Sequence, residues 1–269
     1  MATLPKPDCW APEYARTFND PEVARVYHLR PPYPDGVFTT LAALIVDQPR
    51  TVLDLGCGPG DLARNLLQAA ERVDAVDASP AMIERGRAME QGDHPRLRWI
   101  RGRAEDAPLD PPYALVTAGD SLHWMDWLVT LPRIKDVLSP NGSLAVVGRS
   151  WGTGLAEERA LLSRYSTNPR FRPLNLIEEL ESRGLFHKRG EQGFTSAWNP
   201  TIDEYIGARH SQASIPTETR QAAAFDRETR ALLEQLVLGG QIQATGERLA
   251  LAVHCGVVWG VPRAAKPPR

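Results

Sequence analysis

The stretch VLDLGCGPG, residues 52–60, decides the fold of this 269-residue chain. The run TVLDL at 51–55 is short, apolar and β-branched, which predicts a strand buried on both faces of a sheet. The glycines that follow permit a tight turn from strand to helix and let the backbone approach a ligand closely. Asp77 ends the next expected strand, where its carboxylate can accept hydrogen bonds from two ribose hydroxyls. The pattern therefore predicts a nucleoside site.

Strands and helices alternate on both sides of this turn. Downstream, the apolar spacing predicts strands at 72–76, 97–100, 113–118 and 143–147, and helices at 62–70, 80–90 and 127–138. Upstream, residues 37–46 have the spacing of an amphipathic helix, whereas YHLRPPYP at 27–34 cannot be helical through its prolines. The alternation predicts an α/β fold, with a doubly wound, mainly parallel, Rossmann-like sheet and helices on both faces.

The pattern changes beyond residue 151. Helices are expected at 155–165, 174–183, 201–213 and 217–238, with strand-like stretches at 185–198 and 249–259. We expect 174–198 to complete the sheet and the rest to form a helical cap over the carboxyl ends of the strands, where open α/β sheets bind ligands. The chain then divides into an N-terminal arm (1–36), a core (37–150), a variable cap region (151–248) and a last strand with a tail (249–269).

Composition and charge exclude several classes of function. The chain has 31 Lys and Arg against 33 Asp and Glu, with no long block of one sign, so we expect no nucleic acid partner. The longest apolar runs are far too short to cross a bilayer, which predicts no membrane span. The first residues lack the basic start and apolar stretch of a secretory signal, so a cytoplasmic location is expected. Three cysteines without a C-x-x-C pair argue against a disulfide framework and a metal site.

Two kinds of nucleoside cofactor could use such a glycine turn. A nicotinamide dinucleotide needs G-x-G-x-x-G, but the sixth position counted from Gly56 is Asp61, whose carboxylate would face the pyrophosphate. S-adenosylmethionine (SAM) has no phosphate and carries a sulfonium and an ammonium, so the acidic side chains of Asp54 and Asp61 suit it. The charges favour SAM, with a NAD-type oxidoreductase and a purely structural turn as the alternatives.

Three motifs stand together at a spacing that resembles a known family. DLGCGPG, the acidic residue within VDASPAMI, and AGDSLHW at 118–124 are spaced as in the class I SAM-dependent methyltransferases, within the small-molecule branch that includes trans-aconitate methyltransferase. The resemblance covers about 27–150 well and 151–248 only loosely. It implies a seven-stranded sheet whose last strand, at 249–259, is antiparallel to its neighbours.

The resemblance also implies which residues contact the cofactor. Asp54 would order the ammonium of SAM, Asp77 would hold the ribose, and backbone carbonyls after the fourth strand would meet the ammonium. The implied set comprises Asp54, Gly56, Cys57, Gly58, Asp77, Ala78, Met82, Ala104, Glu105, Gly119 and Asp120. Of these, Ala78 and Met82 would pack against the adenine, and Ala104 and Glu105 would meet its edge.

The arm YHLRPPYP resembles the RPxYP segment that closes over the cofactor in many of these enzymes. Its candidate contacts are Tyr27, Arg30 and Tyr33. A guanidinium at position 30 could pair with the carboxylate of SAM as a bidentate fork. The alternative is a strap that only packs apolar surface.

His123 follows the fourth strand, where the methyl acceptor should sit. It could remove a proton from the acceptor or only position it, because alignment alone can supply much of the acceleration in an in-line displacement. A histidine with a structural role is the third reading. Trp124, Trp151 and Arg149 are the candidate acceptor contacts, with ordinary packing as the alternative for each tryptophan. Arg149, Arg172, Arg209 and His210 would favour a carboxylate acceptor if two of them converged.

The sequence therefore predicts an enzyme that transfers the methyl group of SAM to O, N or C of a small molecule and releases S-adenosylhomocysteine. The acceptor would lie between the rim of the fourth strand and the cap. The alternatives are a SAM-binding protein that has lost catalysis and acts through a partner, and a NAD-type oxidoreductase. No sequence feature favours a particular oligomeric state.

Overall fold

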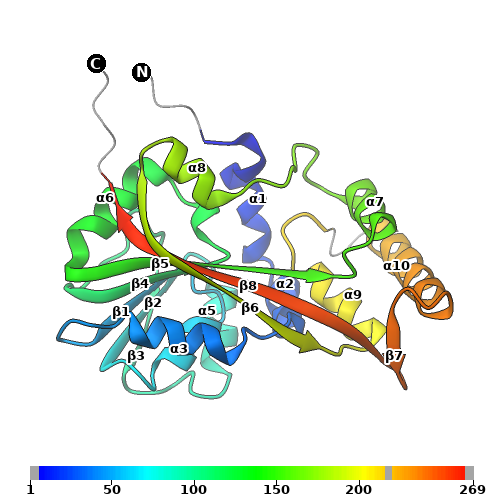
Figure 1. The fold of residues 1–269 in the computed structure, drawn as a ribbon, viewed down its shortest axis with the longest axis horizontal. Helices are drawn as coiled ribbons and strands as arrows, with labels where there is room; N and C mark the ends of the chain where they lie inside the picture. The colour runs from blue at the N-terminus through cyan, green and yellow to red at the C-terminus, as the bar shows by residue number, and fades with distance from the viewer. Residues whose placement is uncertain (1–5, 216–219, 264–269) are drawn as a thin grey trace.

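A computed structural model describes residues 6–215 and 220–263. Its centre is a twisted sheet with the strand order β3-β2-β1-β4-β5-β8-β6 (Figure 1). Strands β1 to β5 run parallel, and β8 lies antiparallel between β5 and β6. The strands of this path are β1 (Thr51–Leu55), β2 (Arg72–Asp77), β3 (Leu97–Arg101), β4 (Tyr113–Gly119), β5 (Leu138–Gly152), β6 (Phe186–Trp198) and β8 (Arg248–Pro262).

The predicted seven-stranded sheet with an antiparallel last strand is confirmed. The strand β7 (Gln243–Thr245), which pairs with the start of β8, was not predicted. It has three exposed residues and no apolar alternation, so its sequence carries no strand signal. Strand β5 extends beyond the predicted 143–147 at both ends, and it includes Pro140-Asn141-Gly142 at a register shift against β4.

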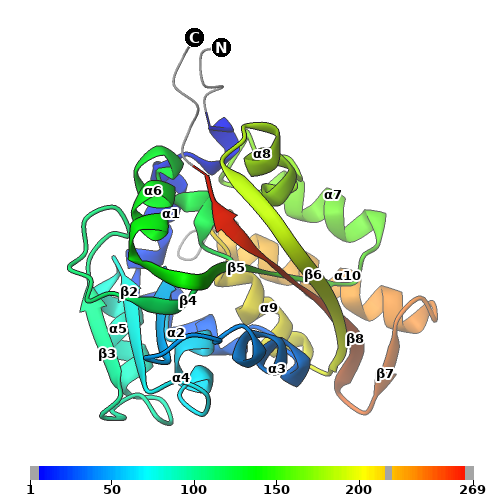
Figure 2. The same cartoon turned by 60° about the vertical axis from the view of Figure 1, so that its left-hand side comes forward.

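Alternate residues along the strands pack on opposite faces of the sheet, as the pleat requires. In β1, Val52 packs with the helices α3 (Asp35–Ala43) and α4 (Asp61–Leu66), whereas Leu53 packs with α6 (Trp127–Val137) and α8 (Leu176–Ser182). Figures 1 and 2 show α6 and α8 on one side of the sheet and α3 on the other. The helix α5 (Pro80–Arg87) packs against β2 and β3. The doubly wound architecture is therefore confirmed.

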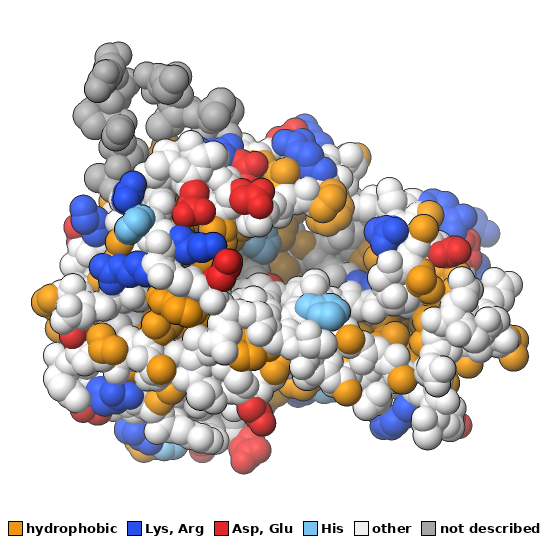
Figure 3. Space-filling model, in the orientation of Figure 1, with side chains coloured by type: hydrophobic (Ala, Val, Ile, Leu, Met, Phe, Trp, Pro, Cys, Tyr) orange, Lys and Arg blue, Asp and Glu red, His pale blue; other side chains and the backbone are white. Residues whose placement is uncertain are grey.

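The cap is formed by three helices beyond the end of β5. These are α7 (Ala156–Tyr165), α9 (Ile202–His210) and α10 (Arg220–Leu238), all within a few residues of their predicted ranges. The predicted residues 217–219 lie outside the described part of the chain. Leu161, Ile215 and Phe225 form a small apolar core between these helices. Figure 3 shows that the molecule is hollowed between the cap and the sheet core.

The N-terminal arm contains short helices where only an ordered arm was expected. They are η1 (Asp8–Trp10), α1 (Pro12–Ala15), η2 (Arg16–Asn19), α2 (Pro21–Val26) and η3 (Tyr27–Leu29). Both α-helices start with proline, whose fixed φ suits the first helical turn. The chain is non-helical through the prolines at 31–34, as predicted. None of the helices in the described residues is long and apolar enough to cross a membrane.

Candidate functional site

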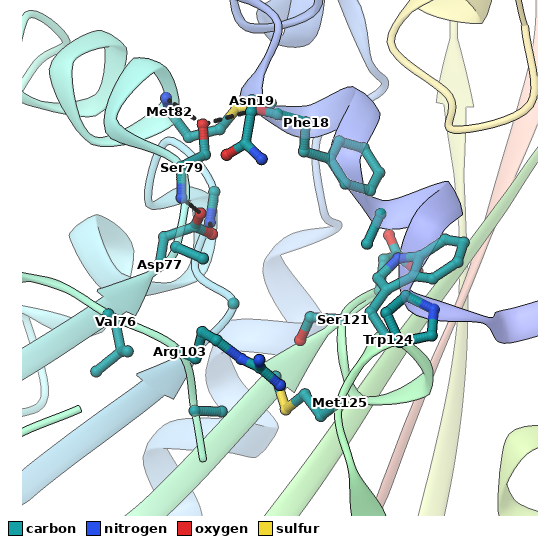
Figure 4. Close-up of a pocket in the computed structure, with 18 of the residues that line it drawn as sticks. Phe18, Asn19, Val76, Asp77, Ser79, Met82, Arg103, Ser121, Trp124 and Met125 are labelled. Carbon is teal, nitrogen blue, oxygen red and sulfur yellow. Dashed lines mark hydrogen bonds between the residues drawn. The ribbon is translucent and has the colours of Figure 1, made fainter. Parts of the chain in front are cut away.

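A cavity of about 350 Å³ opens at the carboxyl ends of the central strands (Figure 4). One wall comes from the loops after β1 and β2, with Gly56, Gly58 and residues 76–82. Another comes from the segment 102–105 after β3 and from 119–125 after β4. The N-terminal arm closes the remaining side with Pro12, Ala15, Arg16, Phe18, Asn19 and Tyr27. The volume is that of an ordinary small-molecule site.

The glycine turn after β1 adopts backbone conformations that other residues rarely take. Gly56, Gly58 and Gly60 have φ values of 64°, 56° and 82°. A Cβ on Gly56 would lie 2.6 Å from the Cβ of Ser121, and a Cβ on Gly60 would lie 2.6 Å from the ring of Trp99. Glycine is therefore favoured here for two reasons: the turn needs positive φ values, and Ser121 and Trp99 pack closely against it.

The carboxylate of Asp77 is held by the turn that it faces. Its Oδ2 accepts a hydrogen bond of 2.7 Å from the backbone amide of Gly58, and its Oδ1 accepts one of 2.8 Å from the amide of Ser79. Burial raises the pKa of Asp77 in spite of these two bonds. Figure 4 shows the side chain at the edge of the cavity, across from Trp124 and Phe18. A carboxylate fixed in this way presents its remaining lone pairs to a ligand.

Asp54 is a buried carboxylate near the end of β1. Its side chain belongs to β1 and is 1% exposed, and Thr117 Oγ1 donates a 2.8 Å hydrogen bond to its Oδ1. Its Oδ2 forms no hydrogen bond of ordinary geometry within the described residues. Burial raises the pKa of this carboxyl to about 7, against the opposing bonds from Thr117 and the amide of Ala63. A buried acid of this kind favours a cationic or hydrogen-bond-donating ligand.

A second, smaller cavity of about 10 Å³ lies behind the glycine turn and is lined by Asp54. It has room for about one water molecule. Cys57, Asp61 and Leu62 line it from the turn, Tyr27 and Tyr33 from the arm, and Gly119 and Arg149 from the ends of β4 and β5. Gly56, Gly119 and Tyr27 also line the main cavity, so the two spaces share a wall.

Arg149 and Asp120 form a buried ion pair at this wall. The Arg149 Nε lies 3.2 Å from Asp120 Oδ2, its backbone amide donates to Oδ1 at 3.0 Å, and its Nη1 donates to the carbonyl of Pro31. Its guanidinium stacks on the ring of Tyr33 at 4.1 Å. Burial disfavours the charge of Arg149, but the surrounding tyrosines and aspartates outweigh burial and raise its pKa. Asp120 itself has a φ of 51°, an uncommon left-handed conformation.

The segment after β3 supplies one more carboxylate to the cavity. Glu105 accepts a 2.8 Å hydrogen bond from the amide of Asp126 and a 3.2 Å bond from Arg103 Nε. Burial opposes its ionisation, but these bonds outweigh burial and lower its pKa. Ala104, Ala78 and the buried Met82 line the cavity around it. This part of the cavity combines an apolar surface with a fixed acceptor, which is suited to a flat heterocycle.

Tyr27 covers the glycine turn from the side of the arm. A Cβ on Gly58 would lie 3.7 Å from the Tyr27 ring, which is ordinary van der Waals contact. Arg30 stands behind Tyr27 and lines neither cavity. Its Nη1 donates to the Tyr27 hydroxyl at 2.9 Å, and its Nε donates to Ser211 Oγ at 2.7 Å.

The rim after β4 is aromatic. Trp124 lines the cavity and makes an edge-on contact with Phe18 on the same side of it, at 6.1 Å between ring centroids. His123 packs between Trp10 and Trp124, at 5.7 and 4.5 Å, and does not line the cavity. Burial lowers the pKa of His123 to about 4, so its imidazole is neutral at neutral pH.

Comparisons with known proteins agree with this geometry. The methyltransferase domain family matches residues 52–142. Trans-aconitate 2-methyltransferase from Methylobacterium radiotolerans is 40% identical over 111 residues, which is 39% of this chain and 40% of that one. Malonyl-[acyl-carrier protein] O-methyltransferase from Halalkalibacterium halodurans is 33% identical over 105 residues, 36% of this chain and 38% of that one. The core of this chain is therefore similar to methyltransferases.

The similarity is concentrated in the core of the chain. The matches to the first curated relatives span less than half of those proteins' length. A malonyl-[acyl-carrier protein] O-methyltransferase from Enterobacter lignolyticus is similar over more, with 27% identity over 77% of this chain and 81% of that one. Among solved structures, a protein from Anaeromyxobacter dehalogenans assigned as a type II methyltransferase aligns with a TM-score of 0.63 at 23% identity, covering 86% of this chain and 97% of that one. The YcgJ protein from Bacillus subtilis gives 0.54 at 17%, with 86% and 99% covered. These structures show the same fold.

The structure brings most of the predicted cofactor residues around one space. Gly56, Gly58, Asp77, Ala78, Met82, Ala104, Glu105, Gly119, Asp120 and Tyr27 line the main cavity, and Asp54, Cys57 and Tyr33 line the adjoining small one. Their roles toward SAM stay predictions. Sequence reasoning missed Ser79, Ser121 and Met125, which stand inside the quoted motifs or one residue beyond. It also missed the arm residues 12–19, which carry no motif.

The predicted acceptor residues are more dispersed. Trp124 lines the main cavity and Arg149 the small one, whereas Trp151 lines neither and packs at 5.1 Å against Trp198 in the cap. The charged residues considered for a carboxylate acceptor do not converge: Arg149 pairs with Asp120, Arg172 with Asp8, Arg209 with Glu158 and His210 with Asp226. Trp124 is thus the one predicted acceptor residue that faces the main cavity.

Proposed function

We propose that this protein is an enzyme that transfers the methyl group of SAM to a small-molecule acceptor and releases S-adenosylhomocysteine. One observation carries the proposal: a buried acid with an unpaired oxygen, Asp54, and a second acid locked to the glycine turn, Asp77, border adjoining spaces at the ends of neighbouring strands. SAM has a ribose diol that Asp77 could bind and an ammonium that Asp54 could bind.

The residues present fit this cofactor. Asp77 would hold the ribose, Met82, Ala78 and Glu105 would surround the adenine, and Asp54 would receive the ammonium through the small cavity. The orphaned oxygen of Asp54 is the strongest support, because leaving a buried polar atom unsatisfied is costly unless a ligand or water completes it. When bound, SAM supplies an activated methyl group on a positively charged sulfur.

The charges of the cavity do not suit a dinucleotide. Three carboxylates, Asp77, Glu105 and Asp120, line it against two guanidinium groups, Arg16 and Arg103, and Arg103 is paired with Glu105. Asp61 begins the helix after the glycine turn, where a pyrophosphate would need to approach. This arrangement repels phosphate and favours a cation, so it supports SAM over a nicotinamide cofactor.

The chain supplies alignment rather than strong acid–base chemistry. The carboxylates that line the cavity are already engaged: Asp77 by two amides, Glu105 by an amide and Arg103, and Asp120 by Arg149. The aromatic rings of Phe18 and Trp124 narrow the space and exclude water from it. Holding an acceptor at near-attack distance in line with a reactive methyl group can supply much of a displacement's acceleration. His123 would act on the acceptor side by position, since it packs against Trp124 and lines neither cavity.

The names of the relatives include a small acid, trans-aconitate, and a malonyl group carried on a protein. For this chain we propose a small-molecule acceptor methylated on O, N or C. A SAM-binding protein without catalysis would keep Asp54 and Asp77 but would not need the aromatic wall of Phe18 and Trp124.

A thermal-shift experiment tests the proposal directly. S-adenosylhomocysteine and SAM should raise the melting temperature, since a ligand that binds only the folded state stabilises it by mass action. NAD and NADP at the same concentration should not. Stabilisation by NAD but by neither adenosyl compound would overturn the assignment. Release of S-adenosylhomocysteine from SAM in the presence of an acceptor library then separates an enzyme from a binding protein.

A further inference from the structure

Arg30 joins two parts of the chain that are 181 residues apart. It follows η3 in the arm, and Ser211 follows α9 in the cap. Arg30 Nε donates to Ser211 Oγ at 2.7 Å, and Nη2 donates to the Ser211 carbonyl. Ser211 is fully buried. The fork of a guanidinium therefore clamps both polar groups of one serine, a geometry that an ammonium cannot reproduce.

The other side of Arg30 supports the aromatic lid of the main cavity. Its guanidinium lies 4.0 Å from the ring centroid of Tyr27 and donates through Nη1 to the Tyr27 hydroxyl. It also lies 6.0 Å from the ring of Phe18. Tyr27 and Phe18 both line the cavity, whereas Arg30 lines neither cavity. Arg30 thus contacts the lid from behind.

The arm and the cap helix are packed closely enough for this link to be specific. Helix α9 contacts η3 and α2, and Gly207 of α9 lies directly under Leu29. A Cβ at Gly207 would clash with the end of the Leu29 side chain. The glycine therefore allows the approach that brings Ser211 within reach of Arg30.

We propose that Arg30 is a positioning residue: it holds Tyr27 against the glycine turn and ties this lid to the cap through Ser211. This inference rests on the proposed function and refines it. The cap then contributes to cofactor affinity without touching the cofactor. The alternative is that Arg30 pairs with the carboxylate of SAM directly, and in that case the effect of Arg30 on binding would be independent of Tyr27.

Two measurements on purified full-length variants test the positioning role of Arg30. Titration calorimetry gives the dissociation constant of S-adenosylhomocysteine, and stopped-flow measurement gives its dissociation rate. Arg30→Lys, which loses the fork, should raise the dissociation constant about tenfold, and Ser211→Ala about threefold or more, as expected for the loss of one or two hydrogen bonds. The increase should come from faster dissociation, because an unsupported lid opens more often. Arg25→Ala removes another arginine of the same arm, exposed and paired with Glu22, and should change the dissociation constant less than about twofold.

A double-mutant cycle makes the test sharper. If Arg30 acts through Tyr27, Tyr27→Phe and Arg30→Lys together should weaken binding by less than the product of their separate effects. Independent effects, or a Ser211→Ala variant that binds like the wild type, would overturn the positioning role. Circular dichroism confirms that each variant is folded, and Ser211→Ala remains informative if Arg30→Lys is not. If the wild type itself does not bind S-adenosylhomocysteine, the proposed function fails, which is a different result.

Discussion

The surroundings of the buried carboxylates shift their pKa in opposite directions in the cavity and in the cap. Asp54 and Asp77 have raised pKa values, and Oδ2 of Asp54 forms no hydrogen bond of ordinary geometry with the described residues. In the cap, Glu158 is also buried, yet ion pairing with Arg209 and hydrogen bonds from Tyr205 and Thr153 outweigh burial and lower its pKa. The cap carries its own cation for Glu158, whereas under the proposed function Asp54 would meet a cation that arrives with the ligand.

This difference assigns different tasks to the two regions. A buried acid that is paired with a cation and hydrogen-bonded is compatible with a stable folded chain. Removing one of its partners leaves an uncompensated charge and destabilises the fold. A buried acid that lacks a partner destabilises the empty protein and gains on binding. Stability and ligand affinity should therefore respond to different substitutions.

The largest expected effect is on the cap. Replacing the buried cation in Arg209→Met leaves Glu158 unpaired and should lower the free energy of unfolding by about 3 kcal/mol or more. Urea denaturation measures this. Arg164→Met, which removes the exposed partner of Glu228, should change it by no more than about 1 kcal/mol. Equal midpoints for Arg209→Met and the wild type would show that the cap does not depend on its internal pair.

The next effect is on the cavity. Asp77→Ala should weaken S-adenosylhomocysteine binding by on the order of 1–3 kcal/mol, because it removes acceptors for the ribose and frees the amides of Gly58 and Ser79. Calorimetry measures the dissociation constant. Asp93→Ala, at an exposed acid in the loop before β3, serves as the control and should bind like the wild type. An unchanged constant for Asp77→Ala would mean that the ribose lies elsewhere.

A smaller effect concerns pH. Because the pKa of Asp54 is raised to about 7 in the empty protein, a cationic ligand must bind the ionised form, and affinity should increase up to about tenfold between roughly pH 6 and pH 7.5. The folded state also holds a proton that the unfolded state releases at lower pH, so Asp54 destabilises the empty protein as pH rises from about 4 to 7. Asp54→Asn should flatten both dependences. Calorimetry across this range would contradict the interpretation if wild type and variant showed the same slope.

The smallest effect is expected at His123. His123→Gln should leave the dissociation constant of S-adenosylhomocysteine within about twofold, since the residue lines neither cavity. Turnover should fall, because the ring packs behind Trp124 and fixes the rim. Its pKa is lowered to about 4, so the wild type loses stability as pH falls below about 6.5, and the variant should lose less. Wild-type turnover in the variant would remove His123 from the mechanism.

The core was predictable because its signals are local. The strand 51–55, the glycine turn and Asp77 lie within 27 consecutive residues, and each follows from short-range rules for strands, turns and helix starts. The segments 104–105 and 119–120 follow from the family spacing. The strand β8 has a clear apolar run, so its range was also predictable.

The arm and the acceptor side were not predictable to the same degree. The residues 12–19 reach the cavity only because the arm docks across it, and no local pattern encodes that docking. Tryptophan is a common residue of ligand pockets, yet the ring of Trp151 lies 4.2 Å from the guanidinium of Arg209 inside the cap. From the sequence alone, the side chain of Trp151 could point toward the cavity or into the cap. Only the positions of β5 and α9 in the folded protein determine which.

The bond between Arg30 and Ser211 has a consequence for how the protein is made. A ribosome releases the glycine turn and Asp77 long before it reaches residue 211, and domains begin to fold from the amino-terminal side. A nascent chain that ends before α9 would already contain Asp54 and Asp77, while Tyr27 lacked its support from the cap. Under the proposed role of Arg30, tight retention of the cofactor would thus begin only after Ser211 has emerged.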